Sequence, residues 1–186
     1  MPEFYDQFYA AIAASPAYAE FCRRAYGMDL GQHGFADMAQ VDALIAASGL
    51  AAGRRGLDLG CGDGRMAEFI ADVTGAHMTG LDNSERAIQH AQARTAGRAD
   101  RLAFVVGDMA HLADAFPPAS FDALISVDTL YFVDTPDFPL EDMLALLKPG
   151  GRLVALYTHA ADPQTPIPVF RRETLPPDRT PFGVAL

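Results

Sequence analysis

The segment from Leu57 to Gly64 has the residue types of a ligand-binding turn. It reads LDLGCGDG, with glycines at alternate positions after an acidic strand end. Residues without a Cβ let the backbone turn sharply and let a ligand lie directly against it. A tight turn alone would explain two such glycines, but three at alternate positions after Asp58 indicate a binding loop.

Dinucleotide-binding enzymes share a glycine-rich first turn and an acid at the end of the second strand. Their spacing is G-x-G-x-x-G, and a pyrophosphate rests on the N-terminus of the following helix. Here the spacing is G-x-G-x-G, and Asp63 stands at the expected helix start. An acid there would repel a diphosphate and attract the ammonium or sulfonium of a cationic aminoacyl ligand. An NAD(P)-dependent oxidoreductase is therefore the second interpretation rather than the first.

Strands that alternate with helices surround this turn. Apolar patterning predicts helices within 3–26, interrupted at Ser15-Pro16, and at 35–48, ended by Gly49. Two more helices follow, one before Gly75 and one after Ser84 as N-cap. The remaining expected elements are strands at 54–59, 76–82, 101–106, 121–127 and 152–157 and a helix at 140–147. This alternation predicts an α/β fold, a Rossmann-like doubly wound parallel sheet with extra N-terminal helices.

Five segments in order resemble the motifs of the class I S-adenosylmethionine-dependent methyltransferases, a Rossmann-like family, in its small-molecule type with N-terminal lid helices. The segments are 57–64, 80–84, 107–109, 121–126 and 146–153, and they cover about half of the chain. Each is weak alone, but their order and spacing are specific. The resemblance implies S-adenosylmethionine as cofactor. It also implies the strand order 3-2-1-4-5, with the family's usual strands 6 and 7 absent.

The resemblance assigns cofactor-binding roles by position. Asp82 would accept hydrogen bonds from the ribose diol, Asp108 would take the adenine amino group, and the Met109 backbone N–H would meet the ring. Ser126 lies at the end of the fourth strand, which faces the methyl group. The other expected cofactor-binding residues are Asp58, Gly60, Cys61, Gly62 and Asn83. Asp122, by contrast, is expected to support the fold.

Methyl transfer from a sulfonium is an in-line displacement, so we expect no metal and an optional general base. After the fourth strand the chain reads SVDTLY, not the Asn/Asp-Pro-Pro-Tyr of enzymes that methylate adenine or glutamine amides. Asp128 stands where an acceptor would lie, although it could equally cap a short helix at 129–133. His33 is the second catalytic candidate, with Gln32 beside it in the loop that follows the first helices.

The composition bears on partners and location. A net charge of −10 would repel a polyphosphate backbone, so a small-molecule acceptor is expected rather than nucleic acid. Two isolated cysteines, an acidic N-terminus and no long apolar run predict a cytoplasmic protein without a signal peptide or membrane span. The acceptor atom and the oligomeric state stay open.

The chain divides by composition into a helical lid segment at 1–52, a nucleotide-binding core at 53–159 and a proline-rich tail at 160–186. The tail ends in Thr180-Pro181 and five residues typical of a first helical turn. We therefore expect the sequence to be cut within an element. A truncated, non-catalytic S-adenosylmethionine-binding module is accordingly the third interpretation.

Overall fold

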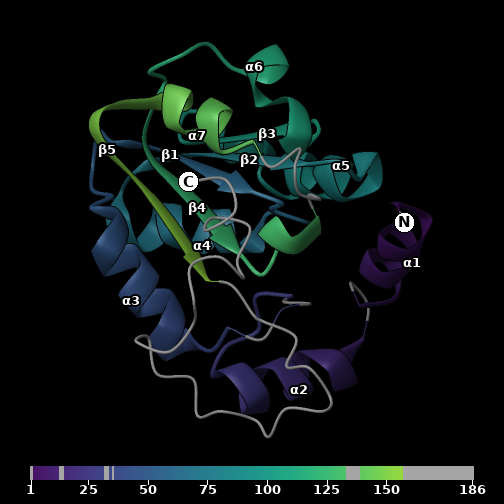
Figure 1. Cartoon of the computed structure of the whole chain (residues 1–186). Coiled ribbons are helices and arrows are strands. Elements are labelled where there is room, and N and C mark those ends of the chain that lie inside the picture. Colours follow the sequence, from purple (N-terminus) through teal and green to yellow (C-terminus); the bar gives the residue numbers. More distant parts are fainter. Residues whose placement is uncertain (1, 13–14, 32–33, 35, 133–138, 157–186) are drawn as a thin grey trace, which may run out of the picture.

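A five-stranded parallel sheet forms the centre of the protein (Figure 1). The computed structural model describes residues 2–12, 15–31, 34, 36–132 and 139–156. Within these residues the strands follow the order β3-β2-β1-β4-β5, which confirms the predicted topology. The strands are β1 (Arg55–Leu59), β2 (His77–Asp82), β3 (Leu102–Val106), β4 (Phe121–Val127) and β5 (Leu147–Leu156).

The register brings the ends of three strands together. In β1, Asp58 is opposite Gly80 of β2 on one side and Ile125 of β4 on the other. The loops that follow β1, β2 and β4 therefore leave the sheet at the same edge. Ligands of open parallel sheets bind outside this carboxyl edge, where neighbouring loops diverge.

Helices cover both faces of the sheet. One face carries α3 (Met38–Ser48), α4 (Arg65–Thr74) and α5 (Glu85–Arg94), and the other carries α6 (Leu112–Ala115) and α7 (Leu140–Leu146). Two separate clusters of buried side chains result, since alternate residues of a strand face opposite sides. The first includes Val41, Ile70, Ile88 and Ile125, and the second includes Leu57, Leu112, Leu124 and Met143. Short 3-10 helices lie at η1 (Ala96–Arg98), η2 (Met109–His111) and η3 (Leu130–Phe132).

Local sequence chemistry explains where the helices begin and end. Ser84 accepts a hydrogen bond from the Ala87 amide at 3.1 Å and caps α5 as predicted. Gly49 and Gly75 end α3 and α4 in left-handed conformations, as expected of glycine at a helix end. Helix α3 begins at Met38 because Asp37 caps it in a capping box, and Phe35, the expected start, lies outside the described residues.

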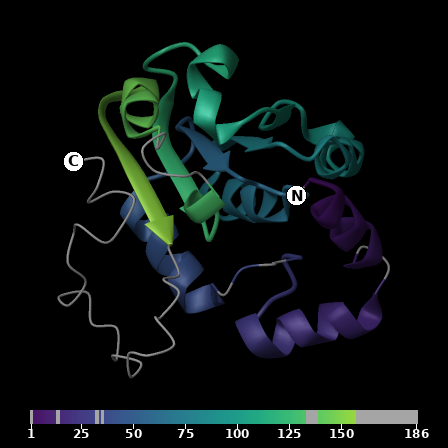
Figure 2. The ribbon, with the colours of Figure 1, turned by 45° about the vertical axis from the view of Figure 1, so that its right-hand side comes forward.

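Two N-terminal helices precede the sheet, as predicted. They are α1 (Pro2–Ile12) and α2 (Pro16–Tyr26), and Ser15 caps the second by accepting from the Tyr18 amide at 3.2 Å. Figure 2 shows both helices beyond the edge toward which the strand arrows point. The N-terminal segment therefore faces the loops of the expected binding site.

The start of the fifth strand was predicted wrongly. It was expected at residue 152, but β5 begins at Leu147, which is opposite Phe121 of β4. Between the paired residues Leu147 and Arg152, the residues 148–151 have no register partner in β4, and Gly150 has a φ of 78°, so the Pro-Gly-Gly segment bulges out of the strand. The tail at 160–186 and its expected final helix lie outside the described residues.

Candidate functional site

The turn after β1 requires glycine at two positions for space as well as conformation. Gly60 and Gly62 have φ values of 72° and 55°. A Cβ on Gly60 would lie 2.7 Å from Cβ of Thr129, and one on Gly62 would collide with the Tyr9 ring of α1. The turn is therefore enclosed by the loop after β4 and by the first helix.

Asp82 at the end of β2 holds this turn. Its Oδ2 accepts from the Gly62 amide at 2.8 Å, and its Oδ1 accepts from the Ser84 amide at 2.9 Å. The amides of Gly60 and Cys61 both donate to the Leu81 carbonyl, at 2.8 and 3.0 Å. A carboxylate has about four acceptor positions, so the two backbone amides alone do not use all of those of Asp82.

Two adjoining pockets flank the turn. We name them the Asp58 pocket and the Asp108 pocket, after a residue lining each. They share the residues Tyr5, Tyr9, Gly60, Thr129 and Phe132. The Asp58 pocket also includes Leu30, Gly31, Gly34, Ala36, Asp58, Cys61, Gly62, Asp63, Met66, Val127 and Asp128, and the Asp108 pocket includes Asp82, Asn83, Gly107, Asp108 and Met109.

Asp58 lines the Asp58 pocket with a carboxyl oxygen that no described group of the protein satisfies. The residue is 2% exposed, and its Oδ2 is buried without a hydrogen-bond partner. Burial, together with the charge of Asp82, raises the pKa of Asp58 to about 7. A buried acceptor of this kind calls for a donor or a cation from a ligand.

Asp63, by contrast, already has cationic partners. Its Oδ2 accepts from Nε of Arg65 at 3.0 Å and lies 3.7 Å from Nη1 of Arg94. Sequence reasoning placed this acid beside a cationic ligand. In the structure the cations beside Asp63 are arginines of the protein, whereas Oδ2 of Asp58 has no described partner.

Three further predicted cofactor residues gather in the Asp108 pocket. Asp108, Met109 and Asn83 line it together with Asp82. The Asp108 side chain is 60% exposed, and its Oδ1 accepts from the Ala110 amide at 2.9 Å. Most of this carboxylate is accessible to a ligand.

Two other predicted cofactor residues, Ser126 and Cys61, are buried at the pockets in different ways. Ser126 is fully buried, and its hydroxyl lies 2.6 Å from that of Thr129, which donates to the Leu59 carbonyl at 2.7 Å. Thr129 lines both pockets, so Ser126 supports the lining from behind. Cys61 lines the Asp58 pocket, and burial raises the pKa of its thiol, which keeps it protonated.

Asp128 lies at the same pocket with an unusual backbone. It is one of two non-glycine residues of the described chain with positive φ, at 54°, and it is 4% exposed. Its amide donates to the Leu156 carbonyl at 2.9 Å, and its carboxylate packs against Gly34. Helix η3 begins at Leu130, so the residue before it is Thr129 rather than Asp128. Left-handed non-glycine residues cluster at functional sites.

The sequence analysis missed the aromatic side chains that reach the pockets from α1 and η3. Tyr5 and Tyr9 line both pockets, and Tyr5 packs edge-on against Phe132 at 5.7 Å between ring centroids. Burial and the charges of Asp82 and Asp63 raise the pKa of Tyr9, so its phenol is protonated. The i, i+4 spacing of the two tyrosines was the available signal. His33 and Gln32 lie outside the described residues.

The contacts of Asp122 confirm the prediction that this residue supports the fold. Its carboxylate accepts from Nη1 of Arg54, the Arg55 amide and Nζ of Lys148, at 2.8, 2.9 and 2.8 Å. Burial alone would raise its pKa, but these hydrogen bonds lower the pKa of Asp122 to about 2. The residue ties the starts of β1, β4 and β5 together, at the edge opposite the pockets.

Within the described residues, no group of three His, Cys, Asp or Glu side chains could hold a metal ion. The helices of the same residues include none long and apolar enough to cross a membrane.

Comparison with known protein families identifies the family to which the chain belongs. The family described as Methyltransferase domain matches residues 57–151, from the glycine-rich turn to the first half of β5. The chain belongs to the class I S-adenosylmethionine-dependent methyltransferases. The sterol 24-C-methyltransferase ERG6B of Gibberella zeae is 34% identical over 134 residues, which cover 70% of this chain and 34% of that enzyme.

Solved structures of similar fold agree with this membership. An S-adenosylmethionine-dependent methyltransferase from Thiobacillus denitrificans, in complex with S-adenosylhomocysteine, has a TM-score of 0.55 and 26% identity, covering 76% of this chain and 55% of that one. The cyclase SpnF has a TM-score of 0.57 and 31% identity, covering 63% and 43%. Nothing in these comparisons supports the oxidoreductase interpretation. The chain spans roughly a third of the length of these curated relatives, namely 34% of ERG6B and 37% of a second methyltransferase.

Proposed function

We propose that this chain binds S-adenosylmethionine and transfers its methyl group to a small-molecule acceptor. Family membership supports the proposal, and so does a solved relative that holds S-adenosylhomocysteine. The observation within the chain that carries it is the unpartnered Oδ2 of Asp58, buried beside the glycine-rich turn. An ammonium group would satisfy this oxygen, and the aminoacyl end of the cofactor has one.

The two pockets provide complementary groups for the remaining parts of the cofactor. In this assignment Asp58 and the turn at Gly60, Cys61 and Gly62 bind the aminoacyl end. Asp82 and Asn83 bind the ribose. The two ribose hydroxyls can both donate hydrogen bonds to one carboxylate. Asp108 and the Met109 amide bind the adenine. All of these groups lie at the carboxyl ends of β1, β2 and β3 or on the loops that follow them.

When bound, S-adenosylmethionine supplies an electrophilic methyl group on a sulfonium. The contribution of the chain is to position the reactants and to exclude water. Tyr5, Tyr9 and Phe132 enclose the pockets with aromatic surface. We infer that α1 and α2, within the segment 1–52, act as a lid over the cofactor core at 53–159.

Asp128 is the proposed proton acceptor for an acceptor molecule with an amine or hydroxyl nucleophile. It is buried at the pocket, and its left-handed backbone directs the chain from β4 into η3. His33 is the second proposal for this role. A carbon or thiolate acceptor would need neither group.

A small, apolar acceptor fits the chain better than nucleic acid does. The net charge of −10 opposes binding to a polyphosphate, and the aromatic lining favours apolar contact. ERG6B is named for methylation of a sterol, a molecule of this kind. Two buried free cysteines favour a reducing compartment, so we propose a cytoplasmic location.

Calorimetry with S-adenosylhomocysteine and with NADH tests the cofactor. We expect binding of S-adenosylhomocysteine alone, and binding of NADH alone would overturn the proposal. Turnover is then measured with methyl-labelled S-adenosylmethionine and a panel of small sterols, amines, phenols and thiols. Binding without transfer to any of them would favour the non-catalytic module, an outcome consistent with a neighbour that is named a cyclase.

A further inference from the structure

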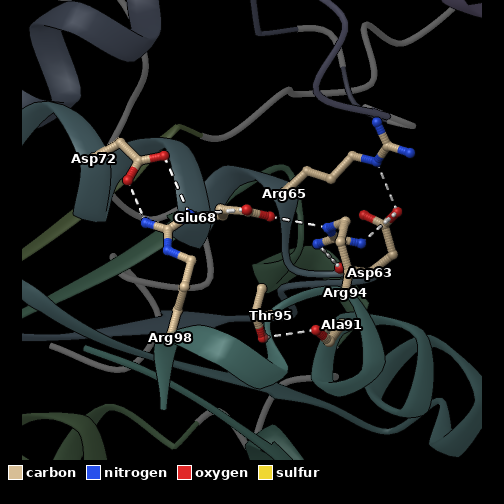
Figure 3. Close-up of polar contacts among 8 residues, drawn as sticks. All are labelled: Asp63, Arg65, Glu68, Asp72, Ala91, Arg94, Thr95 and Arg98. Carbon is tan, nitrogen blue, oxygen red and sulfur yellow. Dashed lines mark hydrogen bonds and ion pairs between the residues drawn. The ribbon is translucent and has the colours of Figure 1, made fainter. Parts of the chain in front are cut away.

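Alternating charges link the glycine-rich turn to side chains of α4, α5 and η1. Figure 3 shows the chain of contacts running from Asp63 through Arg94, Glu68 and Arg98 to Asp72. Arg94 Nε donates to Oε2 of Glu68 at 2.9 Å, and Arg98 Nη1 donates to Oε1 of Glu68 at 2.9 Å. Arg98 also pairs with Asp72. Each arginine thus holds one oxygen of the same glutamate.

Arg94 is the arginine of α5 that reaches the turn. Its Nη2 donates to the backbone carbonyl of Asp63 at 2.6 Å, and its Nη1 lies 3.7 Å from the Asp63 carboxylate. The Arg94 side chain is 30% exposed and the Asp63 side chain 12%. A guanidinium presents several donors in a fixed plane, so it can bridge Asp63 and Glu68 at once.

The Asp63 carbonyl lies just before α4 and takes no part in the hydrogen bonds of that helix. Helix α4 has its N-cap at Gly64, whose carbonyl accepts from the Glu68 amide at 3.0 Å. The carbonyl of Asp63 precedes this first acceptor of the helix. The flanking glycines, Gly62 and Gly64, have φ values of 55° and 79°, and glycine has more backbone freedom than any other residue.

We propose that Arg94 is a positioning residue for the methyl-donor site. Its guanidinium fixes the Asp63 backbone between two glycines, and Glu68 fixes the guanidinium in turn. The Asp63 segment lines the Asp58 pocket, so the anchor sets the shape of that pocket. This inference rests on the proposed binding of S-adenosylmethionine there.

The test compares Arg94→Gln with Arg98→Gln. Both substitutions remove one charged partner of Glu68, but Arg98 bonds to Glu68 and Asp72, on the side away from the turn. Arg94→Gln should weaken S-adenosylhomocysteine binding about tenfold, the loss expected for one charged hydrogen bond. It should also speed amide hydrogen exchange of residues 60–65 in the ligand-free protein. Arg98→Gln should change neither quantity by more than about twofold.

Arg94→Lys serves as the conservative variant. An ammonium can restore one of the two contacts but cannot bridge them, so an intermediate affinity is expected. If Arg94→Gln does not fold, this variant decides: faster exchange and weaker binding support the proposal, and wild-type values contradict it.

Two results would overturn the inference. One is wild-type affinity and exchange in Arg94→Gln, and the other is an equal effect of Arg98→Gln. Failure of the wild-type protein to bind S-adenosylhomocysteine would contradict the proposed function alone. The exchange measurement on the ligand-free variants would still decide the role of Arg94.

Discussion

Asp58 and Asp82 lie on neighbouring parallel strands, and their carboxyl groups differ in their hydrogen-bond partners. Both oxygens of Asp82 accept hydrogen bonds from backbone amides, at 2.8 and 2.9 Å. Oδ2 of Asp58 is buried without a partner, and burial and the Asp82 charge raise the pKa of Asp58 to about 7. Asp82 is thus held by backbone donors, whereas a cation beside Asp58 would favour the ionised form of that buried acid.

The first prediction concerns the pH dependence of cofactor binding. An ammonium group favours the ionised form of Asp58, so affinity for S-adenosylhomocysteine should rise with pH up to about 7 and then level off. Between pH 5.5 and 7.5 the gain should be about 25-fold, because binding below the pKa of about 7 releases one proton. Calorimetry in buffers of different ionisation enthalpy measures that proton. If the affinity did not change across this pH range, the ammonium assignment would be contradicted.

Asp58→Asn should stabilise the ligand-free protein while weakening binding. The pKa of Asp58 is raised from 3.8 to about 7, so its ionisation opposes folding and lowers stability as pH rises from about 4 to 7. Asparagine has no charge to bury, so the variant should gain on the order of 1–3 kcal/mol at pH 8 and much less at pH 4. Urea unfolding at both pH values measures the difference. A variant that is less stable at pH 8 would show that the carboxylate has a partner in the folded chain.

Asp82→Ala should weaken S-adenosylhomocysteine binding far more than Asp122→Ala. Asp82 holds the Gly62 amide and is assigned to the ribose, so its loss should cost about 2–4 kcal/mol of binding free energy. Asp122 bonds to Arg54, Arg55 and Lys148 at the far edge of the sheet. Its loss should lower stability by about 1–3 kcal/mol and leave binding unchanged. Equal affinities of the two variants would refute the ribose assignment.

The pH dependence of Asp122 has the opposite sign to that of Asp58. Its pKa is lowered to about 2, so its contribution to stability is present above pH 3.8 and disappears as pH falls toward 2. The stability difference between wild type and Asp122→Ala should therefore shrink in that window. Acid unfolding monitored by circular dichroism checks it, and a difference that persists at pH 2 would exclude the charge as its source.

The parts of the fold that sequence predicts well are set by neighbours in the chain. Ser84, Gly49 and Gly75 bound helices by local hydrogen bonding and left-handed geometry, which residue type alone indicates. The early start of β5 at Leu147 depends on pairing with Phe121 across a bulge. Such a pairing has no local signature, whereas the turn-like bulge at Pro149 and Gly150 agrees with what the Pro-Gly-Gly segment indicated.

The site follows the same division. Glycine spacing predicted the pocket-lining positions Gly60 and Gly62, and the resemblance to the methyltransferase motifs predicted Asp82 and Asp108. Sequence could not show that Arg65 pairs with Asp63, or that Oδ2 of Asp58 has no partner, because both facts depend on tertiary packing. The same is true of Thr129, which becomes part of the lining only because β4 lies beside β1.

Asp108→Ala should cost affinity and little stability. The Asp108 side chain is 60% exposed, and its bond to the Ala110 amide at 2.9 Å caps only the short helix η2. Loss of the adenine contact should weaken S-adenosylhomocysteine binding by about 1–2 kcal/mol. Thermal unfolding of the ligand-free variant should stay within about 3 °C of wild type. A large drop in melting temperature would mark the residue as structural.

The contact between Gly62 and Tyr9 gives the last prediction. A Cβ on Gly62 would meet the Tyr9 hydroxyl and lie 2.8 Å from Cζ of its ring. The backbone there has a φ of 55°, which costs a residue with a side chain about 1–2 kcal/mol. Gly62→Ala should therefore lower stability and displace the Tyr9 ring from the pocket wall, which weakens binding of S-adenosylhomocysteine.

Tyr9→Ala combined with Gly62→Ala separates the two causes. Removing the ring relieves the collision but not the backbone strain, so the double variant should be more stable than the sum of the single changes allows, by about 1 kcal/mol. Tyr9→Ala alone should weaken binding because it opens the cover that α1 places over both pockets. Urea unfolding and calorimetry of all four proteins complete the cycle. Strictly additive effects on stability would mean that α1 does not pack against the turn in solution, and the proposed lid would then have no contact with the site it covers.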